Sequence, residues 1–246
     1  MKIIAVFNIK GGVGKTATAV NLAAVAAQGK SKVLLADLDP QGASSFYFHQ
    51  NVTDDGKKRL KGKATVKESI HESGYENLDI LPADNEYRQI EFYLKELKGK
   101  SKWLSGLFRP VNRKYDYVVL DCPPNINVFS ENILRNADVV VVPVVPTTLS
   151  VRTYEQLLEY FKEQGIEKRK LIPFFSMYER RKNLHNETIV EFAAAHNETV
   201  DVAIPYISEI ERMGVYQAPY VVKHPESEIS YLYRELWKTV KRKSAR

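Results

Sequence analysis

The feature that most constrains the fold lies at the start of the chain, where a short apolar run leads into a glycine-rich loop and then an alanine-rich stretch. The apolar run is Ile3–Phe7, the loop is Lys10–Thr16 with the sequence KGGVGKT, and the alanine-rich stretch is Thr16–Gln28. A strand, a glycine loop ending in Lys-Thr, and a helix form, in this order, the context that a phosphate-binding loop requires. The glycines allow backbone N–H groups to turn inward as an anion nest, and the helix start adds the positive end of its dipole. We therefore expect a phosphate site, with the Lys15 amine at the β- and γ-phosphates and the Thr16 hydroxyl on Mg²⁺.

The remaining apolar runs alternate with helical patterns. The runs are short and rich in β-branched residues, as is typical of strands covered on both faces in a parallel sheet. They are Val33–Ala36, Leu78–Leu81, Tyr117–Leu120, Val139–Val142 and Leu171–Phe175. Apolar residues at three- and four-residue spacing predict helices at Glu86–Leu97, Val151–Glu163 and Glu226–Lys241. This alternation predicts an α/β fold with a doubly wound, mostly parallel sheet, helices on both faces, and ligands beyond the carboxyl ends of the strands. No repeat or low-complexity linker divides the 246 residues, so we expect a single domain spanning 1–246.

Composition excludes several classes of protein. With 44% hydrophobic and 27% charged residues, the chain is globular in composition and neither disordered nor fibrous. No stretch approaches the roughly 18 apolar residues that a membrane-spanning helix needs, and the N-terminus lacks the pattern of a secretion signal. The single cysteine, Cys122, cannot form an internal disulfide or a cysteine zinc site and is expected to be packed rather than nucleophilic. We expect a cytoplasmic protein in a reducing compartment.

The lysine before the first glycine of the loop closely resembles the deviant Walker A motif of the ParA/MinD ATPases. Two longer segments match the same family, since Leu35–Gly42 resembles its switch I and Tyr115–Pro124 resembles its Walker B strand and switch II. Shorter matches occur at Asn77–Ala83, Ala137–Pro143, Ser176–Tyr178 and Ile204–Pro205. The resemblance covers nearly the whole chain and implies the P-loop NTPase fold. Because the sequence begins at the first strand, it is most similar to the small ParA-type partition ATPases that lack an N-terminal helix-turn-helix domain.

The resemblance implies ATP as the ligand, Mg²⁺ as the metal, and hydrolysis of ATP to ADP and phosphate by in-line attack of water. In the family the leading lysine, here Lys10, crosses a dimer interface to the ATP of the partner, where it neutralises charge that develops during phosphoryl transfer. An exposed loop lysine without this role is the alternative. The nucleotide-binding residues that the resemblance implies are Lys10, Gly11, Gly12, Val13, Gly14, Lys15, Thr16 and Ala17 in the loop, and Met177 and Pro205 around the base.

Three acids at the ends of expected strands take roles from the resemblance. Asp39 positions or polarises the attacking water, and Asp37, which shares a strand face with it, supports Mg²⁺ through water. Asp121 follows a four-residue apolar run, where an unpaired carboxylate is costly and a metal-bound water is a suitable partner. A structural role in capping the following turn is the alternative for Asp37 and Asp39. The implied catalytic set is Lys10, Lys15 and Asp39, and the implied metal set is Thr16, Asp37 and Asp121.

The sequence departs from the family at two positions. Ala17 stands where many relatives have a second threonine, so a hydroxyl contact to the α-phosphate is missing while the backbone N–H remains. Tyr206 stands where many DNA-partitioning relatives have an arginine, which weakens the case for DNA contacts from that loop. The nearby basic residues Arg180, Arg181 and Lys182 partly restore that case.

Positive charge is concentrated near the end of the chain. The formal net charge is +6, and the segment from Arg234 to Arg246 holds six basic residues against one acid. Such a tail is typical of contact with a polyanion, either nucleic acid or an acidic membrane surface, with a solvated basic helix as the alternative. The expected DNA-binding residues are Lys238, Lys241, Arg242 and Lys243, with Arg180, Arg181 and Lys182 as a second cluster. An apolar stripe on the same helix, expected to pack on the sheet, consists of Ile229, Leu232, Leu236, Trp237 and Val240. Asn51–Lys63 is expected to form an exposed basic loop.

Together these features predict a ParA-type ATPase that forms an ATP-dependent sandwich dimer, binds DNA nonspecifically at the nucleoid, and partitions or positions a cargo. A ParB-like or cargo-adaptor partner is expected to stimulate hydrolysis, and the cargo can be a plasmid, a chromosome or a protein compartment. The alternative is a MinD-like positioning ATPase whose basic terminal helix lies on anionic lipid. A metabolic ATPase or reductase-activating protein of the same superfold is disfavoured, because such relatives often add cysteine pairs and this chain has one cysteine.

Overall fold

A computed structural model describes residues 1–56, 58, 65–96 and 102–245. Its centre is an eight-stranded sheet in the order β3-β4-β2-β5-β1-β6-β7-β8. The strands are β1 (Lys2–Val6), β2 (Val33–Asp37), β3 (His71–Tyr75), β4 (Leu78–Leu81), β5 (Tyr117–Asp121), β6 (Val139–Val144), β7 (Leu171–Tyr178) and β8 (Ala203–Pro205). Among these strands only β3 runs antiparallel to its neighbour, so the predicted mostly parallel sheet is confirmed.

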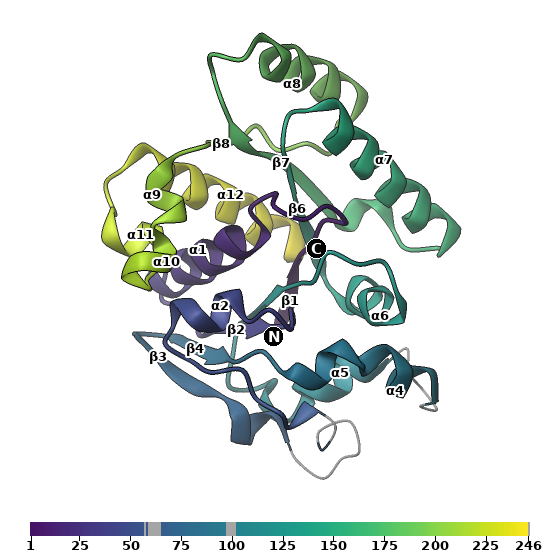
Figure 1. Ribbon diagram of the computed structural model, residues 1–246, viewed down its shortest axis with the longest axis vertical. Helices are drawn as coiled ribbons and strands as arrows, with labels where there is room; N and C mark the ends of the chain where they lie inside the picture. Colours follow the sequence, from purple (N-terminus) through teal and green to yellow (C-terminus); the bar gives the residue numbers. More distant parts are fainter. Residues whose placement is uncertain (57, 59–64, 97–101, 246) are drawn as a thin grey trace.

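Helices cover both faces of the sheet, as predicted (Figure 1). The α-helices are α1 (Lys15–Gln28), α2 (Ala43–Tyr47), α4 (Ile90–Glu96), α5 (Trp103–Phe108), α6 (Val128–Asn136), α7 (Thr148–Glu163), α8 (Asn183–Ala195), α9 (Ser208–Glu211), α10 (Met213–Tyr216), α11 (Tyr220–Lys223) and α12 (Glu228–Ser244). Short 3₁₀ turns are η1 (Val66–Ser69), η2 (Asn85–Arg88), η4 (Arg109–Val111) and η5 (Lys168–Lys170). One face of the sheet is buried under α1, α10, α11 and α12, and the other under α4, α5, α6 and α7.

The register of the central strands brings their carboxyl ends level. Asp121 at the end of β5 lies opposite Asp37 of β2 on one side and opposite Val6 of β1 on the other. The glycine loop follows β1 directly, so the loop and the two acids meet at one edge of the sheet. This is the edge where α/β proteins bind their ligands.

Helix α1 is buried nearly all round because its side chains are small. Its residues from Thr18 to Ala27 are all buried, because the helix packs both on the sheet and against α12, which lies beside it on the same face. Alanine at many of these positions allows close approach from both sides, which explains the alanine-rich composition that marked this segment in the sequence. The rigid packing of α1 holds its N-terminus, and the loop before it, in a defined position.

Several elements differ from the prediction. The helix expected at Glu86–Leu97 is divided, because the Asp84 carboxylate accepts a hydrogen bond from the Glu86 N–H (2.9 Å) and caps η2, and α4 begins only at Ile90. Leu97 lies outside the described residues, as do residues 57 and 59–63 of the expected basic loop. Strand β3 was not predicted because it is a polar edge strand, and β8 because it has three residues. Helices α6 and α8 were also not predicted.

Candidate nucleotide-binding site

The loop between β1 and α1 has the backbone of an anion nest. Gly12 (φ 69°) and Gly14 (φ 86°) both adopt left-handed conformations that L side chains rarely take. A Cβ on Gly14 would also meet the Ser176 Oγ at 2.9 Å, so the loop lies tightly against the end of β7. Gly14 is the N-cap of α1 and accepts a hydrogen bond from the Thr18 N–H (2.9 Å). The α1 N-terminus therefore opens onto the loop, as the sequence predicted.

The two loop lysines lie in different surroundings. The Lys15 Nζ curls back over the loop and donates to the Lys10 carbonyl oxygen (2.9 Å), and burial lowers the pKa of this amine while the Asp121 carboxylate opposes that shift. The Lys10 Nζ donates to the Ser150 Oγ at the start of α7 (3.1 Å). In the single chain, Lys10 is thus held by its own α7, and its role across a dimer interface stays a prediction.

The acids Asp37 and Asp121 form a buried pair under the loop. Asp37 accepts hydrogen bonds from the Ser45 N–H (2.8 Å), the Ser45 hydroxyl (2.7 Å) and the Asp39 N–H (3.2 Å), which hold the start of α2. Burial raises the pKa of Asp37, and the negative charge of Asp121 raises it further. In this conformation Asp37 therefore has the structural role that was the alternative to a role at Mg²⁺, since it caps the turn after β2.

Asp121 is the less satisfied of the two acids. Its Oδ2 accepts a hydrogen bond from the Ser44 hydroxyl (2.7 Å), whereas its Oδ1, within the part of the chain that the structure describes, is buried without a hydrogen-bond partner. Burial raises the pKa of Asp121, and the Ser44 and Thr16 hydroxyls and the Lys15 amine oppose that shift. A buried carboxylate oxygen without a donor is costly. The Thr16 hydroxyl, in the first turn of α1, is near enough to act on this carboxyl. The Thr16 hydroxyl and the Asp121 carboxylate are together suitable oxygen ligands and acceptors for a hydrated divalent cation.

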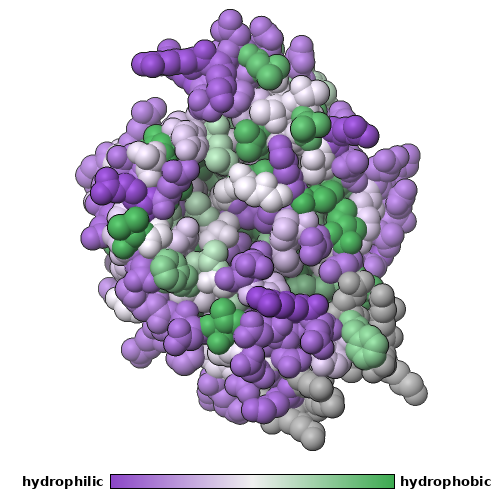
Figure 2. Space-filling model, in the orientation of Figure 1, coloured by the Kyte–Doolittle hydropathy of each residue, from purple (hydrophilic) through white to green (hydrophobic). Residues whose placement is uncertain are grey.

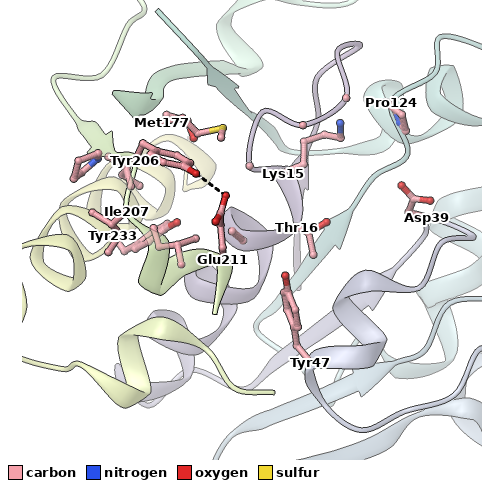
Figure 3. Close-up of a pocket in the computed structure, with 18 residues that line it drawn as sticks. Lys15, Thr16, Asp39, Tyr47, Pro124, Met177, Tyr206, Ile207, Glu211 and Tyr233 are labelled. Atoms are coloured by element: carbon pink, nitrogen blue, oxygen red, sulfur yellow. Dashed lines mark hydrogen bonds between the residues drawn. The ribbon is translucent and has the colours of Figure 1, made fainter. Parts of the chain in front are cut away.

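Asp39 both caps a turn and lines the cavity beside the loop. Its Oδ1 accepts a hydrogen bond from the Gln41 N–H (2.9 Å), so it does cap the turn after β2. Its side chain also lines the cavity beside the loop, on the side where Pro124 follows β5 (Figure 3). The position leaves the carboxylate accessible to a ligand or to water.

A cavity of about 340 Å³ extends from the glycine loop to an apolar pocket beyond β7 and β8. Met177 and Pro205 line it together with the loop, so the structure brings together these predicted residues (Figure 3). Met177 has a left-handed backbone (φ 55°) at a point where the pairing of β7 with β8 shifts register. A left-handed conformation costs about 1–2 kcal/mol for an L residue, and such strain is concentrated at ligand sites. Of the predicted set, Val13, Asp37 and Asp121 lie beneath the cavity wall and are buried.

Sequence reasoning missed much of the cavity wall. Pro124, Ser176 and Ile204 line the cavity too, and they belong to segments that matched the family in the sequence. The lining residues outside those segments are Tyr47, Tyr206, Ile207, Ile210, Glu211 and Tyr233. Of these, Tyr206 was noted only as a departure from the family, and the hydroxyl of Tyr206 donates to the Glu211 Oε1 (2.8 Å; Figure 3). Tyr47 comes from α2 and Tyr233 from α12, so no local pattern in the sequence links them to the loop. Cys122 is fully buried and burial raises its thiol pKa, which agrees with a packed residue.

The two predicted basic clusters lie near opposite ends of the same strand, β7. The Lys243 Nζ donates to the Leu171 carbonyl oxygen (3.3 Å), which places the end of α12 at the beginning of β7. Arg180, Arg181 and Lys182 are exposed and follow the carboxyl end of the same strand. In the α12 cluster Lys238 pairs with Glu235 (2.6 Å), Lys243 is directed inward, and Lys241 and Arg242 are exposed.

The apolar stripe of α12 is packed, as expected. Leu236 and Val240 are 0% exposed, Ile229 is 6% and Trp237 is 7% exposed, and Leu232 is partly buried against the same core. The Trp237 ring also packs edge-on against the Tyr117 ring at the start of β5, with centroids 4.8 Å apart. The apolar stripe of α12 is therefore covered, and the helix presents to solvent a mostly polar face that also carries Tyr231 (51% exposed).

Comparison with known proteins agrees with this site. The AAA domain family matches residues 1–172. A chromosome partitioning protein ParA from Myxococcus xanthus is 31% identical over 258 residues, covering 100% of this chain and 91% of that protein. An uncharacterized protein from Pseudomonas putida is 35% identical over 150 residues, and the match spans only 56% of its length.

A solved structure shows the same architecture. Cobyrinic acid a,c-diamide synthase from Mycobacterium smegmatis, with bound ATP analog and magnesium, superimposes with a TM-score of 0.80 at 25% identity, over 98% of this chain and 94% of that one. The glycine loop, the acids at the strand ends and these likenesses together show that the chain belongs to the ParA/MinD type of P-loop ATPases.

Proposed function

We propose that this protein binds ATP with Mg²⁺ in the cavity beside the glycine loop and hydrolyses it to ADP and phosphate. The observation that carries the proposal is the continuity of the cavity, which joins an anion nest at one end to an apolar pocket at the other. A triphosphate suits the first end and a flat base suits the second, between Met177 and Pro205. The M. smegmatis neighbour, crystallised with an ATP analog and magnesium, supports the same ligand.

Mg²⁺, when bound, supplies positive charge that offsets charge on the phosphate oxygens. The Thr16 hydroxyl is the residue that would hold the ion, and the unpartnered Asp121 Oδ1 would accept a hydrogen bond from its water shell. Asp37 acts behind them by fixing the start of α2 through Ser45. Asp39 orients the attacking water for in-line displacement, and Lys15 stabilises the negative charge of the phosphates.

Hydrolysis by this route requires a dimer, since the second cation comes from the partner's Lys10. The hydrogen bond between the Lys10 Nζ and Ser150 must break for this reach. A hydrogen bond that involves a charged group contributes about 1.5–3 kcal/mol, and the anionic oxygens of a triphosphate on the partner chain would replace the neutral Ser150 hydroxyl as acceptors for this amine. Assembly is thus proposed to depend on ATP.

The proposed surface partner is DNA, bound without sequence preference by the dimer. The packed stripe of α12 supports DNA over anionic lipid, because an interfacial helix must offer an apolar face to the bilayer. In the part of the chain that the structure describes, no helix is both long and apolar enough to cross a membrane. On the face seen in Figure 2, hydrophobic residues lie in small separate groups within a mostly hydrophilic surface.

The M. xanthus relative, a chromosome partitioning protein, supports a role in partitioning or positioning a cargo. We propose further, from the family resemblance of the sequence, that this takes place at the nucleoid and that a ParB-like or cargo-adaptor partner stimulates hydrolysis. Identity to this ParA protein (31%) exceeds identity to the diamide synthase (25%), which favours partitioning over a metabolic reaction.

The test compares duplex DNA binding and sedimentation with anionic liposomes, each with ATP and with ADP. We expect ATP-dependent DNA binding that weakens about a thousandfold between 50 and 200 mM salt if about six phosphates are neutralised. Substituting Lys241→Ala and Arg242→Ala together should weaken binding, whereas the matched control Lys67→Ala with Lys162→Ala, two exposed lysines elsewhere, should not. Liposome binding without ATP-dependent DNA binding would favour the MinD-like alternative.

A further inference from the structure

Glu211 is an acid in the wall of a cavity suited to a polyanion. It lines the apolar end with Tyr206, Ile207 and Ile210, whereas Asp39 lines the opposite end. Figure 3 shows the Glu211 carboxylate directed into the cavity from α9, where it meets the Tyr206 hydroxyl (2.8 Å). Nothing in the hydrolysis of the γ-phosphate uses this carboxylate.

The backbone that carries Glu211 is anchored on both sides. The Arg212 N–H donates to the Ser208 carbonyl oxygen (2.9 Å), and the next residue, Met213, is fully buried beside the Asn21 amide of α1. The Tyr216 hydroxyl also donates to the Glu209 carbonyl oxygen (2.9 Å). These contacts tie the backbone of α9 to α1, and the Tyr206 hydroxyl is the hydrogen-bond partner of the exposed Glu211 carboxylate.

A carboxylate near a triphosphate is unfavourable unless it accepts hydrogen bonds from the ligand. In a nucleoside triphosphate the donors between the phosphates and the base are the 2′- and 3′-hydroxyls of the ribose. An ionised carboxylate has about four acceptor positions, so the Tyr206 hydroxyl leaves room for both ribose hydroxyls. Hydrogen bonds to an ionised acceptor are roughly twice as strong as neutral ones.

We propose that Glu211 determines sugar specificity by accepting hydrogen bonds from the ribose diol, so that the protein prefers ribonucleoside to deoxyribonucleoside triphosphates. This inference rests on the proposed binding of ATP in the same cavity. The Tyr206 hydroxyl holds the carboxylate in its receptive orientation before the ligand arrives.

The experiment measures equilibrium dissociation constants for ATP, 2′-deoxy-ATP, 3′-deoxy-ATP and GTP, each with Mg²⁺, in three proteins. These are the unmodified chain, Glu211→Ala, and the matched control Glu209→Ala, an acid of the same helix that is exposed as Glu211 is but does not line the cavity. We expect the unmodified chain and the control to bind ATP at least about tenfold more tightly than either deoxy analogue, as hydrogen bonds to a charged group imply. In Glu211→Ala the dissociation constant of each deoxy analogue divided by that of ATP should fall close to one.

Two results would overturn the inference while leaving ATP binding intact. One is equal affinity for ATP and the deoxy analogues in the unmodified chain, and the other is an unchanged ratio in Glu211→Ala. A loss of ATP-over-GTP preference in Glu211→Ala with the ATP-to-deoxy ratio intact would also refute it, because the carboxylate would then read the base. Failure of the unmodified chain to bind ATP at all would instead refute the proposed function, and with it this inference.

Discussion

Three glycines of the loop offer a graded test of its geometry by substitution with alanine. Gly11 lacks a left-handed backbone, and a Cβ added there would meet no atom within 4 Å. Gly12 has a left-handed backbone (φ 69°) but open space, and Gly14 has both a left-handed backbone (φ 86°) and a close contact. The series therefore separates backbone strain from steric contact, and Gly11→Ala is the matched control.

The magnitudes follow from these differences. Gly11→Ala should change the free energy of unfolding by less than about 1 kcal/mol, with stabilisation favoured because alanine restricts the unfolded chain. Gly12→Ala should lower the free energy of unfolding by about 1–2 kcal/mol, the cost of an L residue in a left-handed conformation. Gly14→Ala should lose about 1–3 kcal/mol more than Gly12→Ala, because its Cβ would stand 2.9 Å from the Ser176 Oγ and overpack the end of β7.

The assay is equilibrium unfolding in urea, followed by circular dichroism without nucleotide. Adding Ser176→Ala to Gly14→Ala removes the contacting hydroxyl and should recover the steric part while leaving the backbone part. Equal stability of all three single variants would refute the left-handed conformations, and no recovery in the double variant would refute the contact between the loop and β7.

Three further substitutions test the assigned chemistry. Lys15→Ala should weaken ATP binding by about 10- to 150-fold, the value of charged hydrogen bonds, in a titration with a fluorescent ATP analogue; unchanged affinity would exclude the phosphate-binding role. Lys10→Ala should still bind ATP but neither dimerise nor hydrolyse it, as light scattering and phosphate release would show, and an active dimer would exclude the role in trans. Asp39→Ala should bind ATP and accumulate as a dimer while turnover falls by about 10²- to 10⁴-fold; hydrolysis at the parental rate would reduce Asp39 to a turn cap.

The elements that sequence predicted correctly depend on neighbours in the chain. Continuous apolar runs at Val33–Ala36 and Val139–Val142 became central strands because a residue buried on both faces of the sheet must be apolar whatever covers it. The glycine loop was recognisable because left-handed backbone at Gly12 and Gly14 is a property of those residues themselves. Polar or very short strands such as β3 and β8 carry no such signal and depend on the edge they pair with.

The direction of surface side chains was not predictable in the same way. Lys243 reads as one of four equivalent cations in the tail, yet it is directed to the Leu171 carbonyl oxygen at the start of β7. The sequence predicts that Lys10 extends across a dimer interface, yet in the single chain its Nζ donates a hydrogen bond to Ser150 of α7. Both outcomes depend on which distant segment packs alongside, and composition does not record that.

The amino-acid order thus specified the phosphate-binding loop, the parallel sheet and the acids at the strand ends, because each arises from residues adjacent in the chain. The apolar end of the cavity was decided by tertiary structure, since its residues come from three separate segments: Tyr47 from α2, Tyr206 and Glu211 from the segment of β8 and α9, and Tyr233 from α12. They converge because α1 and α12 pack side by side on the same face of the sheet and because β8 pairs with β7. Long-range packing of this kind sets which side chains face a ligand, and it has no local pattern in the sequence.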